Sequence, residues 1–268
     1  MALPAPRSSG TALVTGASAG IGSEIARELA KRRFGVTLVA RREDRLRELA
    51  TELNQEHGVR AEVIGCDLGS ADGRASMASE LRQLELEVDV LVNNAGFGFA
   101  GEFINSDRDR QTAMVALNCE AVVDLTGRYT PAMVRRGAGA VINIASTAAF
   151  QPMPGSATYG ASKAFVLSFS EAVHTELGGT GVSVIAVCPG PVRTEFTEAA
   201  GMEGADESLP ELFWLSAADV ASDAVKAAEA GRRSVINGKI NFAGSLLGRY
   251  TPRAISLPIS KRFWGRAE

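Results

Sequence analysis

The stretch "TALVTGASAGIGSEIARELAKRRFGVTLVARR", residues 11–42, decides the fold of this 268-residue chain. Its apolar runs at 11–15 and 36–40 are short and rich in β-branched residues, which favours strands that are covered on both faces. Between them a glycine-rich loop leads into a segment with helical periodicity at 21–33. A strand, a helix and a second strand in this order predict a crossover unit with two parallel strands.

The same alternation continues along the chain. Further apolar runs predict strands at 61–65, 88–93, 139–145, 182–187 and 234–238. Helical patterns lie at 43–57, 70–86, 107–136, 157–178 and 217–230. We therefore expect an α/β protein, a single-domain Rossmann-type doubly wound parallel sheet with helices on both faces, over residues 11–240. Residues 1–10 are expected to form a disordered lead, and 241–268 a C-terminal extension.

Composition excludes several classes of protein. The net charge of −3 and the pI near 5.6 argue against a nucleic-acid partner. No run of about 18 apolar residues is present, so no conventional membrane span is expected. Three scattered cysteines suit a reducing compartment, which favours a cytoplasmic location. The two histidines lack ligand spacing, so no metal site is expected, and no G-x-S-x-G elbow supports a hydrolase.

The glycine-rich loop is a candidate phosphate site. Gly16, Gly20 and Gly22 permit a tight turn and let backbone N–H groups approach a pyrophosphate at a helix N-terminus. Their spacing is G-x-x-x-G-x-G rather than the more general G-x-G-x-x-G. The position of the loop, after a strand and before a helix, is the context that such a site requires.

The end of the second strand bears on the choice of dinucleotide. An acidic residue there would bind the ribose hydroxyls of NAD. This strand ends instead with Arg41 and Arg42, and a guanidinium matches the 2′-phosphate of NADP(H). Two arginines that merely begin a solvated helix are the alternative. We predict NADP(H) as the cofactor.

Tyr159 and Lys163 in "ATYGASKAF" are spaced to share one face of a helix. An ammonium near a phenol favours the phenolate, which would make the phenol a readier proton donor. By themselves a tyrosine and a lysine at this spacing are more often a core aromatic and a solvated charge.

Four further pieces follow strands of the expected sheet. Asp67 and Leu68 follow the third strand, where a carboxylate can accept from an adenine amino group. "NNAG" (93–96) ends the fourth strand, Ser146 follows the fifth, and "PGPVRT" (189–194) follows the sixth. The carboxyl ends of the strands are where open α/β sheets bind ligands.

This ordered set of motifs resembles the short-chain dehydrogenase/reductase family over residues 11–240. The resemblance implies that Tyr159 donates a proton to a substrate carbonyl during hydride transfer and that Lys163 lowers its pKa and binds the nicotinamide ribose. Ser146 would hold the carbonyl oxygen, an electrostatic role of the oxyanion type. Asn118 would keep a proton-relay water beside the lysine, although a mid-helix asparagine can simply be exposed. The cofactor-binding positions that the resemblance implies are Gly16, Ser18, Gly20, Ile21, Gly22, Arg41, Arg42, Asp67, Leu68, Asn94, Ala95, Gly96, Tyr159, Lys163, Pro189, Gly190, Val192 and Thr194.

The resemblance also implies a homodimer or homotetramer formed through the helices at 107–136 and 157–178. We expect an outer apolar stripe on these helices, although part of it must face the sheet. The residues considered for it are Met114, Leu117, Val122, Phe165, Phe169 and Val173.

Large apolar side chains near the motifs predict a lipophilic ketone or alcohol rather than a sugar. The resemblance of residues 13–42 to one branch of the family implies a 3-oxoacyl or steroid-like carbonyl. The loop at about 191–216 is the expected lid and determinant of substrate choice. Ordinary core packing is the alternative for each of these side chains. The candidate walls are Phe97, Phe99, Phe103, Phe150, Met153, Phe196, Phe213 and Trp214.

Two questions stay open at this point. A dinucleotide-binding sensor or scaffold without chemistry is the alternative function, although such a protein would have little reason to keep Ser146, Tyr159 and Lys163 together. The basic, aromatic tail from Leu246 can touch a partner subunit, the substrate entrance or a membrane surface. We favour a C-terminal helix packed on its own domain over membrane contact, and Pro252 and Pro258 argue against one long helix.

Overall fold

The computed structural model describes residues 3–200 and 210–264. Seven parallel strands form one sheet in the order β3-β2-β1-β4-β5-β6-β7. The strands are β1 Gly10–Thr15, β2 Val36–Ala40, β3 Ala61–Gly65, β4 Glu87–Asn93, β5 Gly139–Ile144, β6 Val182–Cys188 and β7 Ser234–Ile236. The strand order reverses its direction between β1 and β4, which makes the sheet doubly wound and confirms the predicted fold class.

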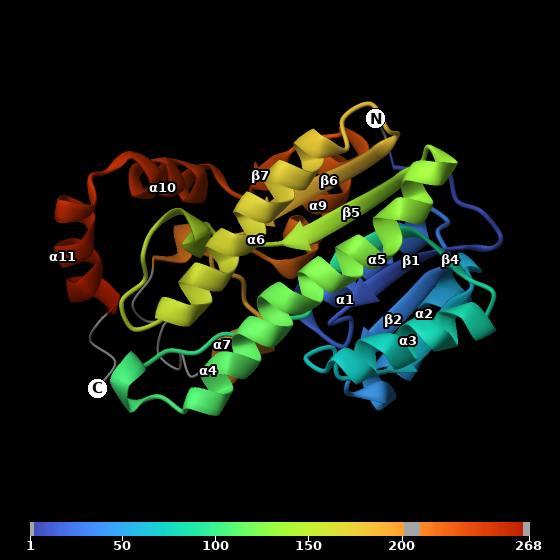
Figure 1. The fold of residues 1–268 in the computed structure, drawn as a ribbon, viewed down its shortest axis with the longest axis horizontal. Coiled ribbons are helices and arrows are strands. Elements are labelled where there is room, and N and C mark those ends of the chain that lie inside the picture. Colours follow the sequence, from blue (N-terminus) through green and yellow to red (C-terminus); the bar gives the residue numbers. More distant parts are fainter. Residues whose placement is uncertain (1–2, 201–209, 265–268) are drawn as a thin grey trace.

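Helices cover both faces of the sheet (Figure 1). Side chains of α1, α2 and α9 pack on one face, and those of α3, α5 and α6 pack on the other. The helices are α1 Gly20–Lys31, α2 Glu43–His57, α3 Ala71–Gln83, α4 Arg108–Val115, α5 Ala121–Arg136, α6 Ala157–Glu176, α7 Glu195–Ala199, α9 Ala217–Glu229, α10 Lys239–Tyr250 and α11 Arg253–Trp264.

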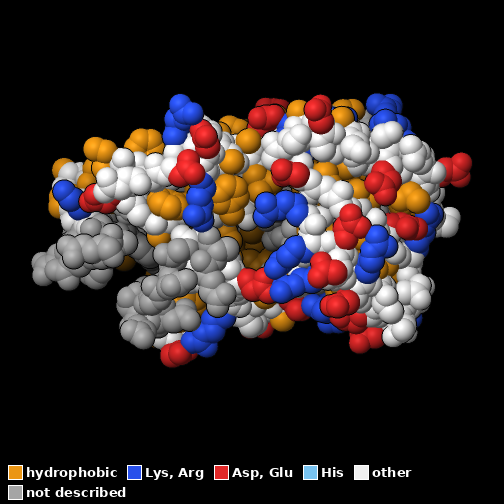
Figure 2. Space-filling view, turned by 90° about the horizontal axis from the view of Figure 1, so that it is seen from below, with side chains coloured by type: hydrophobic (Ala, Val, Ile, Leu, Met, Phe, Trp, Pro, Cys, Tyr) orange, Lys and Arg blue, Asp and Glu red, His pale blue; other side chains and the backbone are white. Residues whose placement is uncertain are grey.

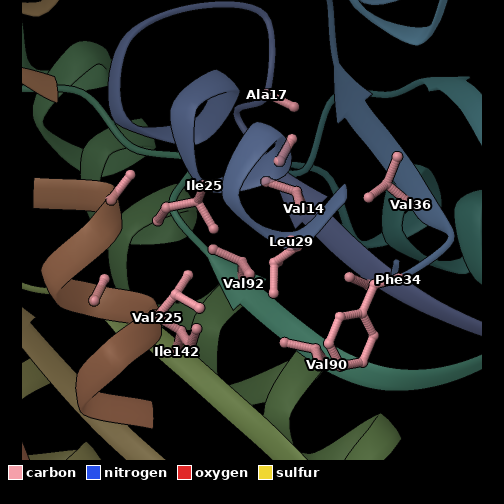
Figure 3. Packing of buried hydrophobic residues seen from close by; sticks show 14 of the residues in the cluster. Val14, Ala17, Ile25, Leu29, Phe34, Val36, Val90, Val92, Ile142 and Val225 are labelled. Carbon is pink, nitrogen blue, oxygen red and sulfur yellow. The ribbon is translucent and has the colours of Figure 1, made fainter. Parts of the chain in front are cut away.

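The larger core cluster lies between the sheet and the first of these layers (Figure 3). Val14 of β1 and Val92 of β4 are fully buried beneath Ile25 and Leu29 of α1, and Val225 of α9 belongs to the same cluster. These strands are buried over their whole length except at the first residue of β4. This explains why they read as nearly continuous apolar runs in the sequence.

The segment 107–136 differs from its prediction, because it is not one uninterrupted α-helix. A π-helical turn, Ala116–Glu120, separates α4 from α5 and contains Asn118. A π turn adds a residue to the helical repeat and is frequent at functional sites. The periodic pattern of the sequence does not reveal such an insertion, since helical segments continue on both sides of it.

The lead and the tail both contact the domain. Arg7, in the segment expected to be a disordered lead, forms ion pairs with Glu87 and with buried Asp89 of β4. The tail forms two helices, α10 and α11, which meet at Thr251 and Pro252. None of the helices in the described ranges is long and apolar enough to cross a membrane.

Candidate active site

The loop after β1 is shaped by its glycines and by Thr15. Gly16 and Gly20 have φ angles of 64° and 61°, which favour glycine, and a Cβ on Gly22 would lie 2.3 Å from the carbonyl oxygen of Gly16. The Thr15 hydroxyl donates to the Val92 carbonyl (2.9 Å) and accepts from the Asn94 N–H (2.9 Å). This hydroxyl therefore joins the carboxyl ends of β1 and β4, where the strand order reverses. The sequence analysis missed Thr15, although it directly precedes the glycine-rich loop.

The NNAG segment (93–96) contacts the glycine-rich loop. It also contacts Asn118 and Lys163, two of the expected catalytic residues. Asn94 Nδ2 donates to the carbonyls of Thr15 (2.9 Å) and Gly16 (3.1 Å), and the Ala95 N–H donates to Thr15 Oγ1 (3.0 Å). A Cβ on Gly96 would lie 2.9 Å from Asn118 Oδ1 and 3.7 Å from Lys163 Nζ. Any larger residue at position 96 would clash with Asn118, so this close contact requires glycine.

Asn118 is a buried structural link rather than an exposed residue. It is 1% exposed and exchanges two hydrogen bonds with the backbone of Phe97, accepting from its N–H (3.1 Å) and donating to its carbonyl (3.0 Å). Its Nδ2 also donates to Ser162 Oγ (3.0 Å), and Ser162 in turn donates to the Tyr159 carbonyl (2.8 Å). Asn118 thus joins the NNAG segment to α6. The sequence analysis did not identify Ser162, which lies next to Lys163.

Lys163 is a buried cation on α6. Its ammonium donates to the Ile144 carbonyl at the end of β5 (2.8 Å) and lies 5.8 Å from the centre of the Tyr159 ring. Burial lowers the pKa of Lys163 to about 8. A cation held in this position is available to stabilise negative charge on its neighbours, and its own charge changes in the mildly alkaline range.

Tyr159 faces Ser146 and the ring of Phe196. The Ser146 hydroxyl, which caps the 3-10 helix η3 (Thr147–Phe150), forms a hydrogen bond with the Tyr159 hydroxyl that lowers the pKa of the phenol. Burial has the larger effect, and the net pKa of Tyr159 is raised. We expected Lys163 to lower the pKa of Tyr159, and this expectation is corrected. Removal of water from the phenolate raises the pKa, and the interaction that partly offsets this rise is the hydrogen bond with Ser146. The phenol is therefore protonated at neutral pH, as an ordinary tyrosine is, and carries a proton that it can donate.

The two arginines after β2 are exposed beside the glycine-rich loop. Arg42 donates to Glu195 of α7 (2.8 Å) and to Ser18 Oγ (3.2 Å), and Arg45 also pairs with Glu195. Arg41 has no hydrogen-bonding or ionic partner among the described residues. Two guanidinium groups at this strand end fit the 2′-phosphate of NADP(H), and Glu195 shows that an anionic oxygen is accommodated there.

Asp67 and Leu68 occupy the end of β3 as expected. Asp67 is exposed and accepts from the Gly69 N–H (3.0 Å), which leaves its second carboxylate oxygen available. Leu68 is 4% exposed and belongs to the core on the α3 side of the sheet.

The segment after β6, residues 189–194, contacts the glycine-rich loop at Gly20. The Thr194 methyl carbon would lie 3.0 Å from a Cβ on Gly20, and Val192 forms a bridge with Leu215. The Pro189 carbonyl accepts from the Thr147 N–H (2.9 Å), which ties this segment to the Ser146 turn. Gly190 lies against Asn241, and Ile21, the second residue of α1, packs on the core. The structure thus brings the expected cofactor-binding positions to one edge of the sheet.

The candidate substrate walls differ in their surroundings. The Phe196 ring lies 5.7 Å from the Tyr159 ring, between centres, and lines the site. Phe150 and Met153 are buried, with Phe150 in a core cluster, and Phe103 is 67% exposed. The expected lid includes 201–209, which lie outside the described residues. Figure 2 shows a hollow with hydrophobic walls near the middle of one face, with Lys and Arg side chains beside it.

Comparisons with known proteins agree with this geometry. Residues 10–203 match the family model for short chain dehydrogenases. The chain is 38% identical over 214 residues to sulfoacetaldehyde reductase 2 of Chromohalobacter salexigens, covering 78% of this chain and 84% of that protein. It is 36% identical over 208 residues to a very-long-chain 3-oxoacyl-CoA reductase of Anas platyrhynchos, covering 75% and 65%.

A solved structure is similar over nearly its whole length. The short-chain dehydrogenase from Sphingobium yanoikuyae, in complex with NADPH, superposes with a TM-score of 0.78 at 32% identity, covering 91% of this chain and 97% of that one. The ordered motifs, the doubly wound sheet and these similarities lead to one conclusion. This chain belongs to the short-chain dehydrogenase family.

Proposed function

We propose that this protein, an NADP(H)-dependent oxidoreductase of the short-chain dehydrogenase family, interconverts a ketone and a secondary alcohol on a lipophilic substrate. The observation that carries the proposal is the grouping of Ser146, Tyr159 and Lys163 at the carboxyl edge of the sheet, with the Phe196 ring 5.7 Å from the Tyr159 ring between centres. A sensor or scaffold would gain nothing from a buried lysine beside a protonated phenol.

In this proposal NADP(H) supplies or accepts the hydride, and the side chains manage the proton and the oxygen. Tyr159 donates its proton to the carbonyl oxygen in the reductive direction, since a phenol carries its proton at neutral pH. Ser146 donates a hydrogen bond to the same oxygen as negative charge develops on it. Lys163, whose ammonium donates to the Ile144 carbonyl, supplies a positive charge 5.8 Å from the centre of the phenol ring.

Asn118 has a positioning role in this scheme. Through Phe97 and Ser162 it fixes the distance between the NNAG segment and α6. The segment with Gly96 would border the bound dinucleotide, and α6 carries both Tyr159 and Lys163. A displacement of one against the other would misalign hydride and proton transfer, to which rates are sensitive.

The lipophilic substrate class is supported by the walls of the site and by one relative. Phe196 packs against Tyr159, and Phe213 and Trp214 lie further along the proposed lid, in and directly after η4. The relative from Anas platyrhynchos is named for a very-long-chain acyl substrate. The relative from Chromohalobacter salexigens is named for sulfoacetaldehyde, which is small and charged. Substrate choice therefore has to be tested directly.

The deciding experiment is the oxidation of NADPH by the purified protein with a panel of carbonyl compounds. We expect turnover with bulky ketones and 3-oxoacyl thioesters, and much less with sulfoacetaldehyde or a ketose. Preferred turnover of the small polar compounds would overturn the lipophilic assignment. Absence of turnover with every compound, in both directions, would favour the sensor or scaffold.

We also propose a homodimer or homotetramer in the cytoplasm. Support for assembly comes from Val123 of α5 and Phe165 of α6, which are 41% and 42% exposed. The expected stripe is only partly outward, because Met114 and Val122 are buried. The three cysteines form no disulfide, in keeping with a reducing compartment. Sedimentation at micromolar concentration tests the assembly, and a monomer would contradict it.

A further inference from the structure

The tail of the chain has a charge opposite to that of the rest. Residues 239–268, which include α10 and α11, contain six of the 28 Lys and Arg residues but only one of the 31 acidic residues. The tail therefore carries a charge of +5, and residues 1–238 carry −8. The last 30 residues thus form a strongly basic segment on an acidic protein.

The buried faces of α10 and α11 are polar or small. Asn241, Ser245 and Gly248 of α10 are buried, one turn apart, and Ser256 and Ser260 of α11 are buried at the same spacing. Asn241 donates to the Phe213 carbonyl (3.1 Å). The small side chains of α10 allow this helix to lie close to the loops of the site.

The outward faces carry the large apolar side chains. On α10, Leu247 and Tyr250 are 69% and 74% exposed, and Phe242 and Leu246 are also exposed. On α11, Ile255 and Leu257 are exposed. This is the reverse of an ordinary surface helix, which turns its apolar stripe inward. Figure 1 places both helices at one end of the molecule, and hydrophobic side chains gather at that end in Figure 2. A patch of this kind marks a docking surface.

We propose that the outward face of α10 and α11 docks on an anionic lipid bilayer. The exposed apolar residues are flanked by the exposed cations Lys239, Arg249, Arg253 and Lys261, and no acidic residue occurs between Glu229 and Glu268. Apolar side chains inserted between headgroups, with cations beside them, are the chemistry of interfacial helices. Each helix has 12 residues, so the tail lies on the bilayer and does not cross it.

A symmetric contact between two copies of this face fits the charges less well. It would bring the cations of one copy against those of the other, with no carboxylate on either helix to pair with them. A bilayer with anionic lipids supplies both the apolar layer and the opposite charge.

The position of α10 connects this surface with the site. Gly248 lies against Gln151 just after η3, and Asn241 lies against Gly190 and the 3-10 helix η4 (Glu211–Phe213). The docked face is therefore on the opposite side of α10 from the loops that follow Ser146 and β6. Docking would hold these loops about 10 Å, one helix diameter, from a bilayer in which a lipophilic substrate dissolves. This step rests on the proposed function, whereas the docking itself does not.

Co-sedimentation with vesicles tests the docking without substrate or cofactor. We expect the protein to bind vesicles of equimolar phosphatidylcholine and phosphatidylglycerol, and to bind phosphatidylcholine alone far more weakly. Added salt should weaken the binding. Because one surface cation contributes about five-fold to binding, Arg249→Gln with Lys261→Gln should weaken it roughly 30-fold. Leu247→Ser with Tyr250→Ser should weaken it at unchanged charge.

Matched controls remove the same groups elsewhere. Arg47→Gln with Arg108→Gln lowers the charge equally at two exposed positions, and Phe103→Ser with Ile104→Ser removes two apolar side chains that are 67% and 86% exposed and lie outside the tail and the assembly helices. Both controls should bind vesicles as the unaltered protein does. Absence of binding to anionic vesicles, equal binding to neutral ones, or tail variants that alter only the sedimentation coefficient would overturn the proposal. Since the assay contains no substrate, such a failure leaves the proposed reductase activity untouched.

Discussion

Replacement of Arg42 by alanine should convert the protein from an NADPH-selective to an unselective enzyme. The guanidinium of Arg42 lies beside the glycine-rich loop and bonds to Ser18 (3.2 Å), within reach of a ribose phosphate placed at the end of β2. A hydrogen bond to a charged group contributes about 1.5–3 kcal/mol. We therefore expect kcat/KM for NADPH to fall roughly ten- to a hundred-fold, with a change of less than about three-fold for NADH.

Glu195 reduces this advantage, because its carboxylate pairs with Arg42 (2.8 Å) and would have to give way to the phosphate. The side chains of both residues are nearly half exposed, and exposed pairs contribute about 0.2–1 kcal/mol. The phosphate therefore wins the competition. Glu195→Gln should tighten NADPH binding by up to about five-fold and leave NADH binding unchanged.

The assay is a fluorescence titration of both cofactors, followed by kcat/KM for each with one ketone. Arg41→Ala measures how much the neighbouring guanidinium contributes to the preference for NADPH over NADH. Arg47→Ala is the control, because Arg47 lies one turn further along α2 and pairs with Glu43 (2.7 Å). If Arg42→Ala and Arg41→Ala both leave the NADPH to NADH ratio unchanged, the arginines only begin a solvated helix and the reasoning is refuted.

Two further predictions concern the lysine and the lid. Burial lowers the pKa of Lys163 from 10.5 to about 8, so between these values the unfolded chain binds a proton that the folded chain has lost, and stability rises with pH. Relative to Lys163→Met, which lacks this titration, the unaltered protein should gain about 2 kcal/mol in urea unfolding between pH 8 and pH 10; parallel pH profiles would exclude the lowered pKa. Trp214 is partly buried, and the Arg193 guanidinium carbon lies 5.6 Å from the centre of its ring. Because the indole would bury apolar surface of a bulky ketone, Trp214→Ala should lower kcat/KM for such a ketone roughly ten- to a hundred-fold, and for a short ketone by less. Equal losses for both ketones would show that Trp214 does not select the substrate.

Much of the fold was predictable from the sequence, because strands buried on both faces consist of nearly continuous apolar residues. The run 182–187 was predicted as a strand and is fully buried within β6. The prediction failed where an uninterrupted α-helix and a helix with a π turn have the same apolar pattern. A single π turn leaves the apolar periodicity of 107–136 almost unchanged, so Asn118 seemed to lie within a continuous helix.

The site was predictable where motifs fix the chemistry and less so where packing decides. Phe150 and Phe103 both lie near motifs, yet one joins the core and the other faces solvent. The direction of the pKa shift of Tyr159 was also missed, because spacing along a helix shows which charges are near but not how much water is removed. Ser162 was missed for a related reason, since a serine inside a helix shows no preference for one partner.

The central claim is that Tyr159 is the proton donor of an NADP(H)-dependent reductase, and Tyr159→Phe tests it most directly. The substitution removes only the hydroxyl that meets Ser146 and keeps the ring against Phe196. For a ketone that the unaltered protein reduces, kcat should fall about 10²- to 10⁴-fold, which is the usual contribution of a general acid. The dissociation constant for NADPH should stay within about three-fold, since the hydroxyl acts in the transition state. A variant that binds NADPH normally and retains near-normal kcat would contradict the account.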